Sequence, residues 1–179
     1  KSFTTNMLLK NLIKSPPQDL KELNIKGLAI NSKKVRKGFI FFDIKGKKSD
    51  GENFIGQAIK KGAILVVASK KCKIKSNKVN ILKINDVRVY LGEVVSKFYK
   101  RKPNNIIAVT GTNGKTSVAE FFYQILDQNK IPVGSIGTLG IKYKKKFIKT
   151  NLTSPDIITL HESLERLKKN KINNVILEA

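Results

Sequence analysis

One stretch of ten residues decides how this chain can be interpreted: Ala108-Val109-Thr110-Gly111-Thr112-Asn113-Gly114-Lys115-Thr116-Ser117. The hydrophobic pattern predicts a strand at 106–109 before it and an amphipathic helix at 116–128 that begins within it. Gly111 and Gly114 allow the backbone to fold closely around oxygen atoms with its N–H groups turned inward. The following helix adds the positive end of its dipole. This context predicts a loop that holds the phosphates of a nucleotide.

The residue types in this loop match the chemistry of phosphate binding. We expect the Lys115 ammonium to be the catalytic residue that reaches the β- and γ-phosphates of ATP, and the Thr116 hydroxyl to be a ligand of Mg²⁺. The other predicted ATP-binding residues are Gly111, Thr112, Asn113, Gly114 and Ser117. The strict pattern G-x-x-x-x-G-K-[ST] needs glycine where Val109 stands, so only G-x-x-G-K-T remains. A glycine-rich turn without a ligand is the alternative interpretation.

The charge of the chain points first to a polyanionic partner. Its 179 residues include 36 Lys and Arg against 13 Asp and Glu, which gives a net charge of +23. Only four of the basic residues are arginines: Arg36, Arg88, Arg101 and Arg166. Specific recognition of phosphates and bases favours the two-pronged guanidinium of arginine. We therefore interpret most of the charge as a solvated lysine surface that reflects genomic base composition, with nucleic-acid binding as the competing hypothesis.

Composition excludes several classes of protein. The single Cys72 rules out an internal disulfide and a zinc ribbon. No run approaches the roughly 18 apolar residues of a membrane span, and no basic start precedes an apolar segment. Because 40% of the residues are hydrophobic, the chain can form a packed core. We expect a soluble cytoplasmic protein.

The first hundred residues alternate between predicted strands and helices. Apolar runs predict strands at 39–44, 63–68 and 79–84, and a strand leading into a turn at 27–35. Helical spacing predicts helices at 52–61 and, after a cap at Asp86, at 87–100. The apolar side of the second helix is expected to hold Val89, Val94, Val95 and Phe98.

The polar segment 100–105 marks a predicted domain boundary, because it contains Pro103 and follows a helix end. We expect one domain at 1–102 and another at 103–179. In the second, strands are predicted at 106–109, 133–136, 141–148 and 175–177, with helices at 116–128 and, after Asp156, at 157–170. This alternation indicates an α/β fold with a parallel sheet. Because the sequence stops at Ala179 inside a predicted strand, we expect it to be truncated.

The full sequence T-G-T-N-G-K-T-S at 110–117 is far more specific than the pattern G-x-x-G-K-T. It resembles the ATP loop of the Mur ligase family, the ATP-dependent amide-forming ligases of peptidoglycan assembly. Segments 31–41, 46–54 and 57–63 resemble the family patterns D-S-R-x-V-x-x-G-x-L-F, G-x-x-x-D-G-x-x-F and Q-A-x-x-x-G-A. Segments 134–140 and 153–161 resemble G-x-I-G-T-x-G and T-T-P-D-x-x-x-L-H, which belong to the UDP-N-acetylmuramoyl-tripeptide synthetase branch. The resemblance covers about residues 25–179.

The resemblance implies a small mixed α/β domain that binds a uridine nucleotide, followed by the truncated start of a parallel-sheet ATPase domain. It implies that the protein adds a diamino acid, meso-diaminopimelate or L-lysine, to UDP-MurNAc-L-Ala-D-Glu with ATP and Mg²⁺. The substrate carboxylate would become an acyl phosphate, which the incoming amine attacks. Because the amino-acid pocket would lie in a third domain outside this chain, we expect the chain alone to be inactive.

The resemblance also assigns residues to the substrate and the metal. The uridine portion would be contacted by Ile30, Ser32, Lys47, Lys48 and Ser49, and the substrate further along by Thr153 and Ser154. Glu178 would hold Mg²⁺ together with Thr116. A carboxylate at the end of a parallel strand also suits a site in the crevice of the sheet. Asn31 and Lys33 stand where the family has Asp and Arg.

Two alternative functions would require other features in the sequence. A folylpolyglutamate-synthetase-like ligase carries a related loop but lacks the uridine-binding domain. A basic nucleic-acid-binding module would show a reader motif or interleaved stacking aromatics, and neither is recognisable. We therefore predict a UDP-MurNAc-dipeptide and a diamino acid as partners, without nucleic acid or membrane, and leave the oligomeric state open. His161, the single histidine, is assigned a structural role in its helix.

Overall fold

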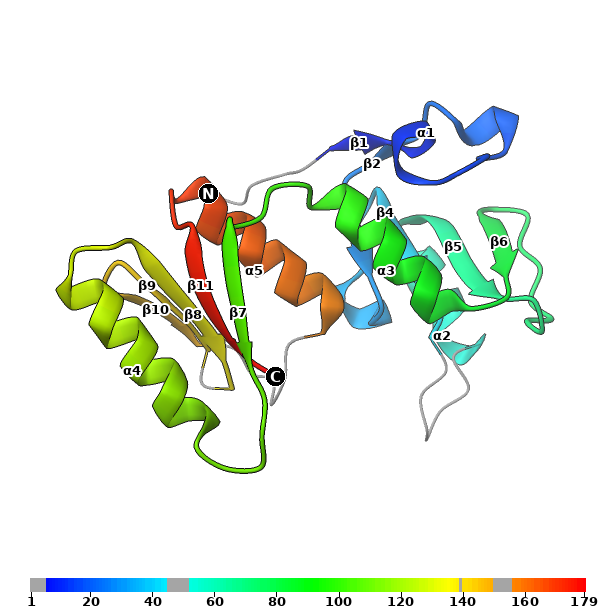
Figure 1. Cartoon of the computed structure of the whole chain (residues 1–179). Coiled ribbons are helices and arrows are strands. Elements are labelled where there is room, and N and C mark those ends of the chain that lie inside the picture. Colours follow the sequence, from blue (N-terminus) through cyan, green and yellow to red (C-terminus); the bar gives the residue numbers. More distant parts are fainter. Residues whose placement is uncertain (1–5, 45–51, 139, 150–155) are drawn as a thin grey trace. The chain divides into compact units, whose positions relative to one another are not determined.

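The chain forms two compact units, Lys1–Phe98 and Tyr99–Ala179 (Figure 1). The computed structural model describes residues 6–44, 52–138, 140–149 and 156–179. Each unit combines helices with its own sheet and its own cluster of buried apolar side chains. The predicted α/β class is confirmed.

The first unit is built on a four-stranded sheet, in the order β3-β4-β5-β6, whose strands all run parallel. The strands are β3 (Gly27–Ala29), β4 (Phe39–Phe42), β5 (Ala63–Ser69) and β6 (Asn80–Ile84). The helical segments are α1 (Leu9–Leu12), η1 (Gln18–Leu20), η2 (Ser32–Lys34), α2 (Glu52–Lys60) and α3 (Val87–Phe98). A short antiparallel pair, β1 (Met7–Leu8) with β2 (Asn24–Ile25), completes the unit. Continuous apolar runs in β4 and β5 suit parallel strands that are covered on both faces.

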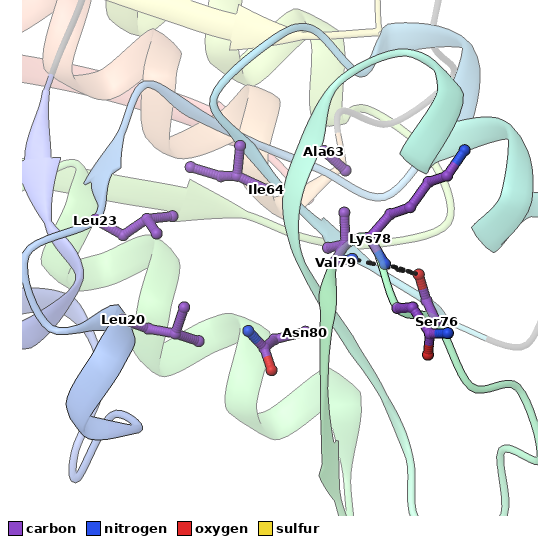
Figure 2. Close-up of a pocket in the computed structure, with 9 residues that line it drawn as sticks. Leu20, Leu23, Ala63, Ile64, Ser76, Lys78, Val79 and Asn80 are labelled. Carbon is purple, nitrogen blue, oxygen red and sulfur yellow. Dashed lines mark hydrogen bonds between the residues drawn. The ribbon is translucent and has the colours of Figure 1, made fainter.

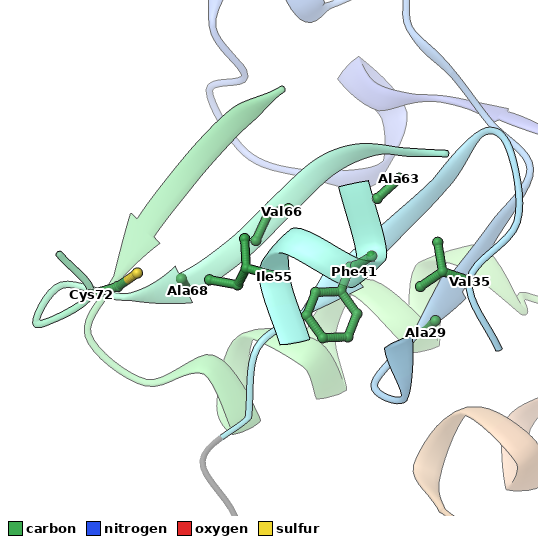
Figure 3. Close-up of a cluster of buried hydrophobic side chains, with 9 residues drawn as sticks. Ala29, Val35, Phe41, Ile55, Ala63, Val66, Ala68 and Cys72 are labelled. Atoms are coloured by element: carbon green, nitrogen blue, oxygen red, sulfur yellow. The ribbon is translucent and has the colours of Figure 1, made fainter. Parts of the chain in front are cut away.

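Helix α2 covers one face of this sheet. Ile55 and Ala58 lie on the buried side of the helix and pack in one cluster with Phe41 of β4 and Val66 of β5 (Figure 3). Cys72 is buried in the same cluster. The cysteine therefore serves as a small apolar core residue, as its type often does.

Helix α3 departs from the expected apolar side at one residue. Its buried residues are Val87, Leu91, Val94, Val95 and Phe98, which share a single helical face. The predictions for Val94, Val95 and Phe98 are confirmed, but the one for Val89 is wrong, because this side chain is 62% exposed. Val89 follows Val87 by two residues, about 200° around the helix, so it points away from the buried face.

The second unit contains a five-stranded sheet in the order β10-β9-β8-β11-β7. The strands are β7 (Asn105–Val109), β8 (Val133–Gly137), β9 (Gly140–Tyr143), β10 (Lys146–Lys149) and β11 (Asn174–Glu178). The helices are α4 (Lys115–Gln128) and α5 (Ile157–Lys169). The strands β7, β11 and β8 are parallel, as predicted, whereas β9 and β10 add an antiparallel edge. Because β11 lies between β7 and β8, its carboxyl end emerges between theirs.

The region 141–148 is a hairpin, not the single strand predicted from its alternating apolar and basic residues. Lys144 and Lys145 form the turn between β9 and β10, and both have a positive φ, of 45° and 59°. Two-residue turns of this kind are normally marked by asparagine and glycine. Two lysines carry no such signal, so the alternation hides the reversal.

Strand β9 shows how helices cover both faces of the second sheet. Ile141 and Tyr143 join the cluster that contains Leu167 of α5. The residue between them, Lys142, pairs instead with Glu120 of α4 at 2.8 Å. Because side chains alternate along a strand, α4 and α5 lie on opposite faces of the sheet, with α4 on the side of Lys142.

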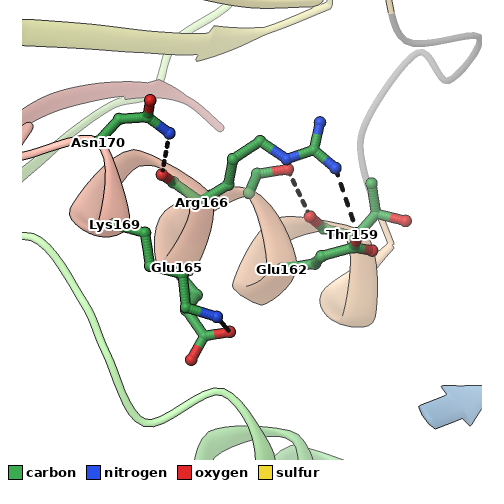
Figure 4. A network of polar contacts seen from close by, with 7 residues as sticks. Thr159, Glu162, Glu165, Arg166, Lys169 and Asn170 are labelled. Atoms are coloured by element: carbon green, nitrogen blue, oxygen red, sulfur yellow. Dashed lines mark hydrogen bonds and ion pairs between the residues drawn. The ribbon is translucent and has the colours of Figure 1, made fainter. Parts of the chain in front are cut away.

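Helix α5 begins where its sequence predicts and ends at Lys169, one residue before the predicted end. The Asp156 carboxylate caps it by accepting a hydrogen bond from the Thr159 N–H at 2.9 Å. Ion pairs one turn apart run along it, from Glu162 to Arg166 and from Glu165 to Lys169 (Figure 4). These pairs place the carboxylate N-terminal to the cation, which is the favourable order on a helix.

A hollow in the first unit lies at the amino ends of β5 and β6 (Figure 2). Leu20, Ala63, Ser76 and Asn80 are among the residues that line it. The turn after β3 that holds Ile30 and Ser32 lies at the carboxyl end of a parallel strand, so the hollow is at the other edge of the sheet. None of the helices in the described ranges is long and apolar enough to cross a membrane.

Candidate functional site

The candidate site lies where the parallel strands β7, β8 and β11 end. The glycine-rich loop 110–114 follows β7, Thr138 follows β8, and Glu178 is the last residue of β11. In the ladder Glu178 lies opposite Val109, and the Ala179 N–H donates to the Val109 carbonyl at 2.9 Å. Three segments that are far apart in the sequence therefore meet at the carboxyl ends of the parallel strands. Parallel α/β sheets commonly bind ligands at this end of their strands.

The loop has the backbone that its glycines were expected to allow. Gly111 and Gly114 have φ of 149° and 77°, in the region that side chains disfavour. Helix α4 begins at Lys115, and the Val118 N–H bonds to the Gly114 carbonyl at 3.0 Å. The first N–H groups of any helix lack carbonyl partners within the helix and so are free to meet an anion. The loop is solvent-exposed and open to a ligand.

Lys115 occupies the position expected of a phosphate-binding lysine. It is the first residue of α4, and its ammonium donates a hydrogen bond to the Gly111 carbonyl. The side chain therefore folds back across the loop. A negatively charged phosphate would offer this ammonium a stronger, charge-assisted bond than the neutral carbonyl does.

The Glu178 carboxylate lies between two hydroxyl groups. The Thr116 hydroxyl, from the first turn of α4, donates to Glu178 Oε2 at 3.3 Å. The Thr138 hydroxyl, from the end of β8, donates to the same oxygen at 3.4 Å. Both distances exceed the about 2.7–2.8 Å of a strong O–H···O bond. Both contacts are long, and the carboxylate keeps lone pairs for another ligand.

Gly137 provides the space for this carboxylate. A Cβ atom at Gly137 would lie 2.6 Å from the carboxyl carbon of Glu178 and 2.7 Å from its Oε1. Neither distance is compatible with van der Waals contact, so any larger residue at 137 would displace the Glu178 side chain. The Glu178 carboxylate therefore occupies space that is available only because residue 137 has no side chain.

The oxygen donors at this edge suit Mg²⁺. A hydroxyl and a carboxylate are hard ligands, and Mg²⁺ typically combines one or two such protein groups with water and substrate phosphates. The structure places Thr116 and Glu178, the two residues to which the family resemblance assigns Mg²⁺, side by side next to the phosphate loop. Within the described residues no group of three or more His, Cys, Asp or Glu gathers as a closed metal cage. An open magnesium site completed by phosphates therefore fits these residues.

Helix α4, which presents Lys115 and Thr116, is tied to the sheet by a polar contact. The Lys142 ammonium pairs with Glu120 at 2.8 Å and lies 4.3 Å from the centre of the Tyr123 ring. The hydrogen bond from Lys142, and then one from Gln124, lower the pKa of the Glu120 carboxyl. The contact joins the helix to β9 on the face opposite α5.

In the first unit the structure describes two of the predicted substrate residues. Ile30 and Ser32 lie in the turn that follows β3, and Ser32 is only 3% exposed. Its hydroxyl donates to Gln57 Oε1 of α2 at 2.6 Å. Asn31 caps the turn by accepting a bond from the Lys33 N–H at 2.9 Å. The neutral amide thus supplies the acceptor that this turn needs at that position.

Five further predicted substrate residues lie outside the described residues: Lys47, Lys48, Ser49, Thr153 and Ser154. At the carboxyl edge of the second sheet, the sequence prediction did not include Gly137 and Thr138 as site residues. Their signal was a Gly-Thr pair directly after a predicted strand. It is visible in the sequence, but it does not show that β8 lies beside β11.

Comparison with known families accounts for both units. The model of the Mur ligase family, catalytic domain, matches residues 24–99, and the model of the Mur ligase middle domain matches residues 109–179. This chain belongs to the Mur ligase family. The matched ranges include the turn at Ser32, the phosphate loop and Glu178.

Several curated relatives of this chain carry the name UDP-N-acetylmuramoyl-L-alanyl-D-glutamate–2,6-diaminopimelate ligase. The Brucella melitensis protein is 36% identical over 163 residues, which is 91% of this chain and 33% of that protein. The Rickettsia rickettsii protein is 39% identical over 160 residues, 87% of this chain and 33% of that protein. The chain therefore spans about a third of the length of the curated relatives it matches.

Solved structures of Mur ligases have the same fold. A structure of a UDP-N-acetylmuramoyl-L-alanyl-D-glutamate–2,6-diaminopimelate ligase superimposes with a TM-score of 0.81 at 24% identity, over 97% of this chain and 36% of that one. A MurF ligase from Thermotoga maritima, crystallised with ADP, superimposes with a TM-score of 0.56 at 27% identity, over 84% of this chain and 31% of that one. The first superposition includes both units.

Proposed function

We propose that this chain carries the uridine-substrate and ATP-binding portions of a ligase that joins 2,6-diaminopimelate to UDP-N-acetylmuramoyl-L-alanyl-D-glutamate. The curated relatives at 36–39% identity bear that activity in their names. Between diaminopimelate and L-lysine, these names favour diaminopimelate. The observation that carries the ATP-binding part is the meeting of Thr116 and Glu178 beside the loop that begins α4.

In this proposal the loop residues 111–117 hold the phosphates of ATP. The Lys115 ammonium would leave the Gly111 carbonyl and neutralise charge on the β- and γ-phosphates. The first N–H groups of α4 and the positive end of its dipole would act on the same oxygens. Because phosphoryl transfer depends mainly on positioning and charge stabilisation, these groups supply the portion of catalysis that this chain contains.

Thr116 and Glu178 would hold Mg²⁺ through their oxygen atoms. When bound, the cation supplies positive charge that offsets the negative charge of the transferring phosphoryl group. In the first unit Ile30 and Ser32, with Lys47, Lys48 and Ser49, would contact the uridine portion. Thr153 and Ser154 would hydrogen-bond the substrate further along.

The reaction balances in two steps. An oxygen of the substrate carboxylate bonds to the γ-phosphorus of ATP, and ADP leaves, which produces an acyl phosphate. The amine of the diamino acid then bonds to the acyl carbon, loses a proton and expels inorganic phosphate. ATP and UDP-linked sugars are cytoplasmic compounds, so the proposed activity is a cytoplasmic one.

Binding of ATP to this chain tests the proposal. Isothermal titration with ATP and Mg²⁺ should show one site, and Lys115→Met should weaken it by roughly 10–100-fold, the loss expected for a hydrogen bond to a charged group. Lys83→Met removes an exposed lysine from β6 of the first unit and is the matched control. The proposal is wrong for this site if the wild-type chain binds no ATP or if both variants bind it alike.

We also expect the chain to form no product by itself, because it spans about a third of its relatives. The measurement is release of phosphate with UDP-MurNAc-dipeptide, diaminopimelate, ATP and Mg²⁺ present. Turnover by the chain alone would contradict this expectation.

A further inference from the structure

We propose that Thr138 is a positioning residue of the cation site: its hydroxyl holds the Glu178 carboxylate in place for Mg²⁺. This inference rests on the proposed function, because it assigns a role within the ATP-binding site. Thr138 touches no phosphate in this role and acts through Glu178. The observation behind it is that hydroxyls from two different elements donate to the same oxygen, Glu178 Oε2.

The hydroxyls of Thr116 and Thr138 would have different roles once a cation is bound. Thr116 belongs to the first turn of the phosphate-loop helix, and as a metal ligand its oxygen must turn a lone pair toward Mg²⁺. A hydroxyl carries a single proton, and reorienting it for the metal weakens its donation to Glu178. Thr138, which follows β8, is not a proposed metal ligand. Its hydroxyl can keep donating to the carboxylate while the cation is bound.

Glu178 needs this support because its side chain is only partly buried and has several rotatable bonds. Restricting such a side chain costs conformational entropy, which weakens metal binding unless other contacts restrict it beforehand. Gly137 leaves the space that the carboxylate occupies, and Thr138, the next residue, supplies the hydrogen bond.

The contacts of the Glu178 carboxylate are with residues that are distant in the sequence. Thr138 and Glu178 are 40 residues apart, and Thr116 and Glu178 are 62 apart. The ladder between β8 and β11, in which Ile136 lies opposite Leu177, brings them together. Partners that orient a metal ligand in this way typically change metal affinity by 10–100-fold when they are removed.

The test compares how strongly Mg²⁺ improves ATP binding in matched variants. The dissociation constant of ATP is measured by titration with saturating Mg²⁺ and again with EDTA, and the ratio of the two is the cation effect. Thr138→Val removes the hydroxyl and keeps the shape of the side chain, and Thr138→Ser keeps the hydroxyl. Glu178→Gln and the double variant with Thr138→Val complete a cycle. Ser96→Ala, which removes a hydroxyl from α3 of the first unit, is the distant control.

The inference predicts a defined pattern. Thr138→Val should leave ATP binding in EDTA unchanged and reduce the cation effect by about tenfold. Thr138→Ser and Ser96→Ala should behave like the wild type. Thr138→Val should add nothing to Glu178→Gln, because the carboxylate it positions is already gone. A merely structural role would instead alter binding in EDTA as well.

Two failures can be told apart. If the wild-type chain shows no ATP binding, or binding without a cation effect, the proposed function fails and the role of Thr138 fails with it. If the wild type shows the cation effect and Lys115→Met weakens ATP binding, but Thr138→Val matches the wild type, only the role of Thr138 is overturned. An equal loss from Thr138→Val with and without Glu178→Gln would overturn it too. Should Thr138→Val not fold, Thr138→Ala is judged against Thr138→Ser by the same ratio.

Discussion

Two glycines show how differently the same residue type acts in this chain. At Gly137 a Cβ atom would collide with the Glu178 carboxylate, so the position must stay empty for the site to form. At Gly56, within α2, a Cβ atom would meet nothing within 4 Å. The first glycine is required by the site, whereas the second only lowers the stability of its helix.

Gly56→Ala should therefore stabilise the protein. Alanine is favoured over glycine inside a helix by about 1 kcal/mol, and the open space around residue 56 adds no clash. We expect urea denaturation to show an increase of that size in the free energy of unfolding. The matched variant Gly137→Ala, whose Cβ meets the Glu178 side chain, should show no such gain. Destabilisation by Gly56→Ala would contradict the description of α2.

We expect His161 to make the stability of the protein depend on pH. Burial, and then the positive charge of Lys102, lower the pKa of the His161 imidazole below its usual 6.5. Its Nδ1 atom is buried and has no hydrogen-bond partner among the described residues. The prediction that His161 is a structural residue of α5 therefore has a measurable consequence for stability.

The sign of this effect follows from the lowered pKa. The unfolded chain binds a proton at about pH 6.5, before the folded chain does, so stability is full above that pH and falls as the pH drops toward the lowered value. Because the chain has one histidine, His161→Leu should flatten the pH dependence of the free energy of unfolding in the range just below about pH 6.5. Unfolding in urea across that range measures it. Equal slopes in both proteins would contradict the assignment.

At the scale of elements, the β9–β10 hairpin contains residues in an unfavourable backbone conformation. Lys145 adopts a φ of 59°, a conformation that costs a residue with a side chain roughly 1–2 kcal/mol. Lys145→Gly should relieve this cost and stabilise the second unit by about 1 kcal/mol. Thermal or urea unfolding would measure the gain.

Lys146→Gly is the control for the hairpin. This lysine lies in β10 itself, where glycine weakens a strand. The two neighbouring substitutions should therefore have opposite signs, although each removes one positive charge. A gain from both would mean that charge, not the turn, governs the stability of the hairpin.

At the scale of the whole molecule, each unit depends on its own core. Leu167 of α5 is fully buried in the cluster that joins α5 to β8 and β9. Leu167→Ala should lower the free energy of unfolding of the second unit by about 2–5 kcal/mol, because it removes packed atoms and leaves a cavity. Phe121→Ala, on an α4 residue that is 62% exposed, should change it by less than about 0.5 kcal/mol.

Hydrogen exchange localises the effect of the buried substitution. Protection of amides should fall in Tyr99–Ala179 in the Leu167→Ala variant, while Lys1–Phe98 keeps its protection, because a unit with its own core can unfold by itself. An equal loss of protection in both units would show that they unfold together.

Much of each unit could be predicted from the sequence, because local patterns depend on local physics. Asp156 marked the start of α5 because its carboxylate can bond to a free N–H, and the structure shows that bond. Val89 and the hairpin after Gly140 were mispredicted because the local sequence carries too little information. One apolar residue does not show which side of a helix it occupies, and two lysines are not a sequence signal for a turn.

The sequence by itself determined the phosphate loop, since Gly111, Gly114 and Lys115 act through the backbone conformation of a few consecutive residues. It also indicated, through the family patterns, that Glu178 belongs with Thr116. Only the tertiary structure decided that Thr138 reaches the same carboxylate and that Gly137 makes room for it. The reason is the strand order: β11 enters the sheet between β7 and β8. No stretch of sequence encodes that neighbour relation locally, and it arises only when the sheet assembles.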